Sequence, residues 1–80
     1  MKLRPITTEK AVKLIDVDNT ISFEVDRKTT KPEIIKEIEK LFNVKVEKVR
    51  TSITNNKKIA FVKLKKENLA IDLATKLGMI

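Results

Sequence analysis

Residues 59–64 read IAFVKL, a run in which apolar side chains would fall on both faces of a β-strand. The two faces alternate along the run, one with Ile59 and Phe61 and the other with Ala60, Val62 and Leu64. Strands that are apolar on both faces are covered on both sides. The run therefore predicts an interior strand of a sheet, which we extend over residues 57–65.

The preceding segment predicts the hairpin partner of this strand. In residues 44–54 (VKVEKVRTSIT) the alternation of apolar residues changes phase near Glu47 and Lys48. A one-residue slip of this kind predicts a strand that begins late or carries a β-bulge. The dipeptide Asn55-Asn56 predicts the tight turn between the two strands, because asparagine tolerates positive φ.

Two further strands are predicted nearer the N-terminus. Residues 19–26 (NTISFEVD) alternate cleanly between apolar and polar side chains, which predicts a half-buried strand. Residues 2–6 (KLRPI) predict a short first strand. Pro5 confines that strand to an edge of the sheet, since proline cannot donate a hydrogen bond to a ladder.

Three segments have helical periodicity. Residues 8–16 form the first, and Glu9 stands four residues before Lys13, the favourable order for an ion pair. The second begins at Thr30 and Glu33, which have the spacing of a capping box. The predicted apolar faces of these two helices are Ala11, Val12, Leu14 and Ile15 in the first, and Ile34, Ile35, Ile38, Leu41 and Phe42 in the second.

The ends of the later helices are predicted from single residues. Asn43 terminates the second helix in a left-handed conformation, and Gly78 does the same for the third. The third helix begins at Asn68 as N-cap. Its predicted buried residues are Leu69, Ala70, Leu73, Ala74 and Leu77.

The resulting order is β-α-β-α-β-β-α. This order predicts an α+β fold in which helices pack on a small, mainly antiparallel four-stranded sheet. With 80 residues, the chain is long enough for one domain, 1–80, and too short for two.

The inventory of reactive side chains is small. Cysteine and histidine are both absent, and Ser22 and Ser52 are the only serines. Thiolate metal sites and histidine-based acid–base catalysis are thereby excluded, and a single glycine cannot form a phosphate-binding glycine loop. We expect no enzyme activity, no cofactor and no bound metal, and no apolar run is long enough to span a membrane.

Positive charge is concentrated in particular segments. The 18 lysines and arginines exceed the 11 acidic residues by 7, a balance that favours a polyanionic partner. Five lysines lie within residues 57–66, with no carboxylate among them. Arg27, Lys28 and Lys31 form a basic turn just before the second helix, where the helix dipole adds positive potential. RNA contact and a merely solubilising basic surface are the two interpretations of these segments.

One alternative is suggested by residues 57–64. KKIAFVKL resembles the ribonucleoprotein octamer of RNA-recognition-motif proteins, in which aromatic residues stack on bases. Ile59 and Leu64, however, stand where that family has aromatics, and the predicted helix between the second and third strands is absent from that family's order. A non-RNA module that binds an acidic protein or an anionic lipid is a second alternative.

Several motifs in register resemble one family across nearly the whole chain. RPITTEKA, the block NTISFEVDRKTTKPEIIKEIEKLFNVKVEKVRT, the segment AFVKLK and the closing LA…LATKLG are similar to archaeal-type members of ribosomal protein family twenty-three of the large subunit. The resemblance implies strand order 1-2-4-3. It also implies binding to large-subunit ribosomal RNA beside the polypeptide exit tunnel.

The partners and site residues follow from this resemblance and from the basic segments. We expect a cytoplasmic, ribosome-bound protein, monomeric when free, whose partners are ribosomal RNA, neighbouring ribosomal proteins, the signal recognition particle and nascent-chain factors, with no membrane contact. Glu9 is the expected docking residue for the last two. The expected RNA contacts are Arg4, Lys10, Arg27, Lys28, Lys31, Arg50, Lys57, Lys58 and Lys63.

Overall fold

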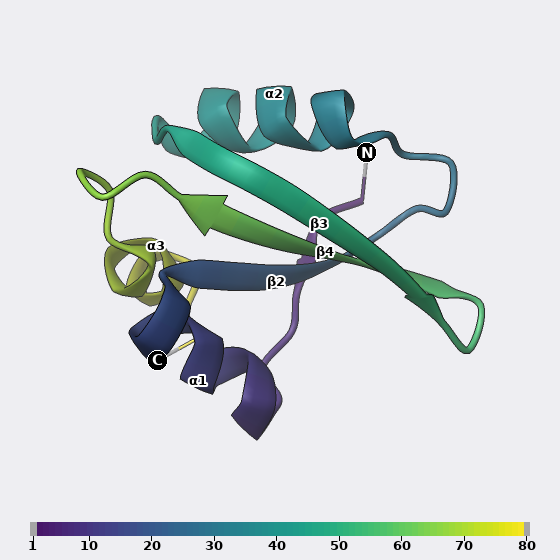
Figure 1. Ribbon diagram of the computed structural model, residues 1–80, viewed down its shortest axis with the longest axis horizontal. Coiled ribbons are helices and arrows are strands. Elements are labelled where there is room, and N and C mark those ends of the chain that lie inside the picture. The colour runs from purple at the N-terminus through teal and green to yellow at the C-terminus, as the bar shows by residue number, and fades with distance from the viewer. Residues whose placement is uncertain (1, 80) are drawn as a thin grey trace.

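The computed structural model describes residues 2–79, which form one antiparallel sheet of four strands and three helices (Figure 1). The elements in chain order are β1 (Arg4–Pro5), α1 (Glu9–Asp18), β2 (Thr20–Val25), α2 (Lys31–Phe42), β3 (Val46–Thr54), β4 (Lys57–Leu64) and α3 (Ala70–Lys76). The strand order is β1-β2-β4-β3. The predicted α+β class, element order and strand order are confirmed, and β4 is an interior strand, between β2 and β3.

The pairing register gives the sheet two different faces. Antiparallel partners lie on the same face, and Ser22, Phe61 and Arg50 are partners across β2, β4 and β3. We call the face that carries these three residues the outer face. The opposite side is the core face, made of Ile21, Phe23 and Val25 from β2, Ala60, Val62 and Leu64 from β4, and Val46 and Val49 from β3.

The core face packs against α2 and α3, the two helices that follow β2 in the chain. Ile34 and Ile38 of α2 and Leu73 and Ala74 of α3 belong to one buried cluster with the core-face residues. Ile15 of α1 joins the same cluster. Burying each large apolar side chain contributes about 1.5–3 kcal/mol, so this cluster is the main source of stability.

Helix α1 lies on the other side of the molecule from α2. Figure 1 shows α2 along β3, whereas α1 and α3 lie together near β2. Ala11 and Leu14 of α1 border a cavity together with Ser22 and Phe61 of the outer face. Thr20 and Ser22 are consequently only 1% exposed. The expectation of a half-buried β2 was wrong, because α1 covers the polar side of this strand.

Most local signals for turns and caps are confirmed. The Thr30 N–H donates to Glu33 Oε1 at 3.0 Å, and the Glu33 N–H donates to Thr30 Oγ1 at 3.4 Å, which completes the capping box. Asn43 ends α2 with φ of 53°, and Gly78 follows α3 with φ of 75°. Asn55 and Asn56 both have positive φ in the β3–β4 turn. A register shift between Val46 and Lys48 confirms the predicted bulge in β3.

The start of α3 differs from its prediction. The helix begins at Ala70, and neither Leu69 nor Asn68 supplies a side-chain cap. Instead Asn19, between α1 and β2, accepts a hydrogen bond from the Ala70 N–H at its Oδ1 over 2.6 Å. The prediction of Asn68 as N-cap was wrong, because the cap comes from a residue that is distant in sequence.

Two leucines predicted to be buried are exposed. Leu69 is 54% exposed because it precedes α3, so the helical periodicity does not apply to it. Leu41 is 57% exposed, and the neighbouring Phe42 packs against the core in its place. The predicted ion pair between Glu9 and Lys13 was also wrong, since the ion pairs within residues 2–79 do not include it. None of the helices in the described part of the chain is long and apolar enough to cross a bilayer.

Candidate nucleic-acid interface

The outer face gathers cations from three strands, β1, β3 and β4. Arg4 is paired with Glu24 across β1 and β2, and Arg50 with Phe61 across β3 and β4. The Arg50 guanidinium lies over the Phe61 ring, 5.5 Å from its centroid, a distance suited to a cation–π contact. The cations of this face are Arg4, Lys48, Arg50, Lys57 and Lys63.

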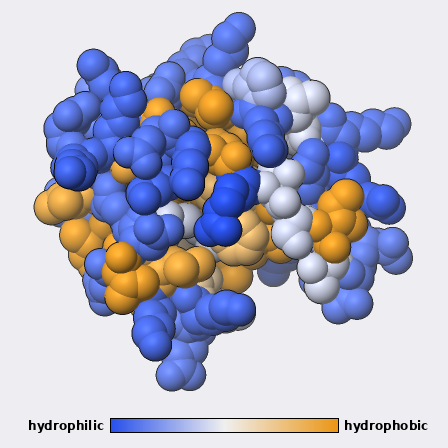
Figure 2. Space-filling model, in the orientation of Figure 1, coloured by the Kyte–Doolittle hydropathy of each residue, from blue (hydrophilic) through white to orange (hydrophobic). Residues whose placement is uncertain are grey.

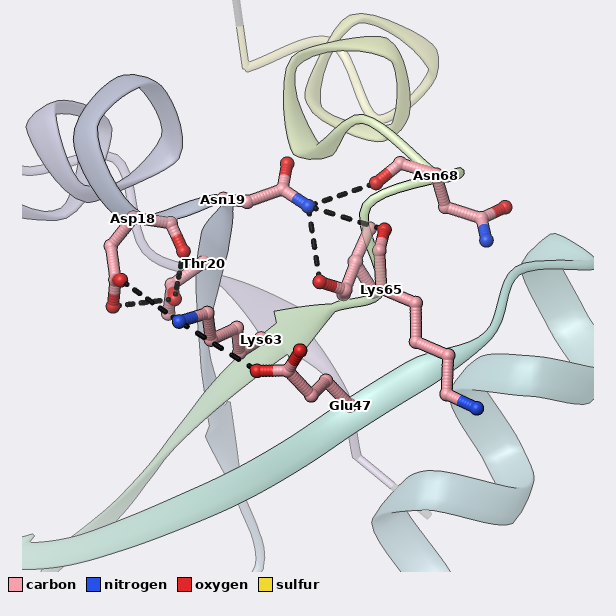
Figure 3. A network of polar contacts seen from close by, with 8 residues as sticks. Asp18, Asn19, Thr20, Glu47, Lys63, Lys65 and Asn68 are labelled. Atoms are coloured by element: carbon pink, nitrogen blue, oxygen red, sulfur yellow. Dashed lines mark hydrogen bonds and ion pairs between the residues drawn. The ribbon is translucent and has the colours of Figure 1, made fainter.

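Part of this positive charge is neutralised at one end of the sheet. Lys63 Nζ lies 3.3 Å from Asp18 Oδ1 and 3.7 Å from Glu47 Oε2, as Figure 3 shows. The pKa of Asp18 is lowered, chiefly because Lys63 donates a hydrogen bond to it. The Lys63 ammonium is therefore already held by two carboxylates, and an RNA phosphate would have to compete with them.

A second carboxylate neutralises cations at the β1 edge. Glu24 Oε2 lies 3.1 Å from Lys2 Nζ, and Glu24 Oε1 lies 4.0 Å from Arg4 Nη1. The hydrogen bond from Lys2 lowers the pKa of Glu24. Arg4 keeps 70% of its side chain exposed, so its long contact to Glu24 leaves it accessible.

Three cations of the outer face have no acidic partner. Lys48, Arg50 and Lys57 are exposed, and within residues 2–79 none of them takes part in an ion pair. We call these three residues the unpaired cluster. Exposed cations without an acidic partner are available to phosphate, so the cluster is a candidate for binding RNA.

The basic turn forms a separate group beyond the other end of β2. Arg27 and Lys28 are exposed between β2 and α2, and Lys31 is the first residue of α2. Lys58 lies on the core face and donates a hydrogen bond to the Thr29 carbonyl. Lys58 thereby ties β4 to the turn, and it is half-buried rather than free at the surface.

The remaining predicted residues lie at the start of α1. Lys10 borders the cavity between α1 and the outer face, as does Lys57. Glu9 is exposed in the first turn of α1 and does not border that cavity. The structure thus places Arg4, Arg50, Lys57 and Lys63 along the outer face, with Lys10 beside it. Lys58 lies on the opposite face, and Arg27, Lys28 and Lys31 lie at the basic turn.

Two features of this part of the molecule were missed from the sequence. Lys48 belongs to the unpaired cluster because the bulge places it opposite Lys63, on the outer face. The phase change in residues 44–54 carried that signal. The Asn19 side chain, which also donates to the carbonyls of Leu64 at 3.1 Å and Asn68 at 2.9 Å, left no signal in the sequence (Figure 3).

Other surfaces are mixed in character. Hydrophobic groups gather near α1 and α3 in the space-filling view, against a mainly hydrophilic surface (Figure 2). Val17 is 68% exposed at the end of α1. No group of three or more acidic side chains that could hold a metal ion is found within residues 2–79.

The fold and these surfaces define a class: small basic α+β proteins with a cationic sheet face. A family model described as Ribosomal protein L23 matches residues 1–71. The large ribosomal subunit protein uL23 of Pyrobaculum aerophilum is 51% identical over 78 residues, which are 96% of this chain and 96% of that protein. The uL23 protein of Methanothermobacter thermautotrophicus is 47% identical over 78 residues, or 96% of this chain and 91% of that protein.

The chain therefore belongs to the ribosomal protein L23 family. It is a structural protein of the large ribosomal subunit and not an enzyme, in agreement with the expectation from sequence. Family membership also places it on the ribosome, in the cytoplasm.

Proposed function

We propose that the whole chain acts as one domain that binds large-subunit ribosomal RNA beside the polypeptide exit tunnel. The observation that carries this proposal is the unpaired cluster of Lys48, Arg50 and Lys57 on the outer face. Arg4, Lys10 and Lys63 extend the same surface. Phosphate contacts from lysine and arginine dominate the affinity of proteins for nucleic acid.

The basic turn provides a second contact with RNA. Arg27 and Lys28 are exposed beside the first turn of α2, where the helix dipole favours an anion. Lys31 adds its charge at the same place. Lys58 holds the turn by donating a hydrogen bond to the Thr29 carbonyl. This second contact would fix the orientation of the protein on the RNA.

Protein partners take the surfaces that carry little positive charge. Neighbouring ribosomal proteins would contact the region where Val17 and Leu69 are exposed, since exposed hydrophobic patches mark protein contacts. Glu9, at the start of α1, would contribute to docking of the signal recognition particle and nascent-chain factors. When free, the protein would be a monomer.

The dependence of binding on salt tests the RNA contact. A variant with Lys48, Arg50 and Lys57 all changed to alanine should bind large-subunit RNA more weakly than the wild type. If each residue neutralises one phosphate, the slope of log affinity against log salt should become shallower by about 2 to 2.7. Filter binding to an in vitro transcript of the Pyrobaculum aerophilum large-subunit RNA measures both quantities.

The matched control removes the same charge elsewhere. Lys13, Lys36 and Lys76 are exposed on the three helices, and their triple alanine variant should nearly keep the wild-type slope. Equal effects of the two triple variants would contradict the assignment to the outer face. Failure of the wild-type protein to bind this RNA at low salt would contradict RNA binding itself and favour a non-RNA module.

A further inference from the structure

A cavity of about 380 Å³ separates α1 from the outer face of the sheet. Its apolar walls include Ala11 and Leu14 from α1 and Ile59 and Phe61 from β4. This volume lies within the range of small-molecule sites in proteins. The cavity is thus large enough to hold a compact, flat apolar group.

Ser22 lines the cavity and carries a buried polar atom without a partner. Ser22 is 1% exposed, and its Oγ has no hydrogen bond within the described residues. Its neighbour on the same face, Thr20, is equally buried but donates to the Asp18 carbonyl at 2.9 Å. A buried hydroxyl without a partner destabilises a protein, whereas an apolar side chain of similar size would not. The position of Ser22 therefore indicates a group that arrives from outside and forms a hydrogen bond.

Positive charge lines the same cavity. Lys10 and Lys57 both border it, and neither takes part in an ion pair within residues 2–79. The complementary guest has an apolar flat body, a polar edge and a negative charge nearby. A nucleotide has these three properties, whereas an apolar peptide segment lacks the charge.

We propose that this cavity accepts a single unstacked base of the ribosomal RNA. The base lies against Ile59 and Phe61, and an adjacent phosphate contacts Lys10 and Lys57. A rotation of the Ser22 side chain brings its Oγ within hydrogen-bond distance of the polar edge of the base. Proteins commonly recognise RNA through bases that are splayed out of a loop or bulge. The inference rests on the proposed function and adds a base contact to its phosphate contacts.

The cavity is continuous with the unpaired cluster. Phe61 borders the cavity and also carries the Arg50 guanidinium over its ring. Lys57 belongs to both sites. A strand of RNA that follows the phosphate contacts of the outer face would therefore pass the mouth of the cavity.

Replacement of the unpartnered hydroxyl tests the base contact. Ser22→Ala should weaken binding to the Pyrobaculum aerophilum large-subunit transcript about fivefold, the equivalent of one hydrogen bond. It should also make one protein-protected base reactive to dimethyl sulfate or carbodiimide. The midpoint of thermal unfolding of the free variant should be unchanged or higher, because an unsatisfied buried group has been removed. A merely structural role would lower that midpoint and leave base reactivity unchanged.

Thr75→Ala is the matched control, because it also removes one hydroxyl. Thr75 lies in α3 rather than on the sheet, is exposed, and does not border the cavity. This change should alter neither the affinity nor the reactivity of any base. Weakening of the same size in both variants would overturn the proposal.

A second variant blocks the cavity without removing a polar group. Ala11→Leu keeps a good helix former in α1 and should fill part of the cavity. Loss of a stacked base is worth about tenfold or more in affinity. The same base should become reactive, while the protection of the RNA backbone from hydroxyl radicals persists. A circular dichroism melt confirms that the variant is folded.

Base reactivity and backbone protection, measured together, separate this inference from the proposed function. Backbone protection by the wild type, with base reactivities that neither Ser22→Ala nor Ala11→Leu changes, would overturn the base contact alone and favour a protein segment as the guest. Absence of both base and backbone protection would overturn RNA binding, and the base contact with it.

Discussion

Asn19 connects three elements through one side chain. It ends α1 in the left-handed conformation, with φ of 50°. Its Nδ2 donates to the carbonyls of Leu64 and Asn68, and its Oδ1 accepts from the Ala70 N–H. Asparagine is suited to this place because it tolerates positive φ and has both a donor and an acceptor.

Replacement of this side chain should be costly although glycine fits the backbone. Asn19→Gly retains the left-handed conformation but leaves the start of α3 without its cap. We expect a loss of about 2–3 kcal/mol in the free energy of unfolding, measured by urea denaturation. Asn43→Gly is the control, because Asn43 has φ of 53° at the end of α2 and is exposed. Equal losses in the two variants would show that the Asn19 hydrogen bonds contribute little.

The alternation of faces along β4 could have distinguished Lys57 from Lys58. Lys57 and Lys58 were both predicted to contact RNA, yet neighbouring residues in a strand point to opposite faces. Lys58 shares the parity of Ala60 and Val62, and it lies on the core face beneath the basic turn. The role of Lys58 as a structural tie was therefore partly predictable, whereas the Asn19 cap was not, because its partners are 45–51 residues away.

Among the elements, α2 has the best-defined start, and this start should respond to acid. The Thr30 backbone N–H donates to Glu33 and lowers the pKa of that carboxyl. The folded protein therefore binds this proton less tightly than the unfolded chain does. The stabilisation is complete above the unfolded pKa of about 4.3 and is lost as the pH falls through the lower folded value. Asp18 and Glu24, whose pKa values are also lowered, act in the same direction.

A neutral variant isolates the contribution of Glu33. Glu33→Gln can still accept the hydrogen bond from Thr30, but it does not titrate. The free energy of unfolding, followed from about pH 6 to about pH 3, should therefore fall less steeply in this variant than in the wild type. Identical acid dependence in the two proteins would contradict a role for the capping-box carboxylate.

The elements themselves were largely predictable, and their contacts were not. Periodicity located the helices and strands because local apolar patterns determine which face is buried. Burial of Ser22 was missed, since the polar face of β2 gives no sign that α1 packs over it. Glu39 of α2 accepts a hydrogen bond from the Val46 N–H at 3.0 Å, and no local pattern indicates this partner. Contacts between elements of this kind depend on tertiary geometry, which a single sequence does not specify.

At the scale of the whole molecule, two surfaces meet along α1. Lys10 borders the cavity beside the outer face, whereas the adjacent Glu9 is exposed and does not border it. Glu9 is the acidic residue of the first turn of α1, where the helix dipole favours a negative charge. This location explains why an acidic residue follows the N-cap of α1 even if it binds no partner protein. A second role for Glu9 therefore has to be tested by a binding experiment.

Glu9→Ala should separate partner docking from RNA binding. The substitution should weaken binding of the signal recognition particle to intact ribosomes by about 3- to 10-fold, as expected when one charged contact at the rim of an interface is lost. Affinity for large-subunit RNA should stay within about twofold of the wild type, because a residue outside the RNA contacts changes neither phosphate nor base contacts. Asp16→Ala, which removes an exposed acid near the other end of α1, should alter neither measurement. Unchanged binding of the particle to ribosomes that carry Glu9→Ala would refute the docking role and leave Glu9 as a residue that only stabilises the start of α1.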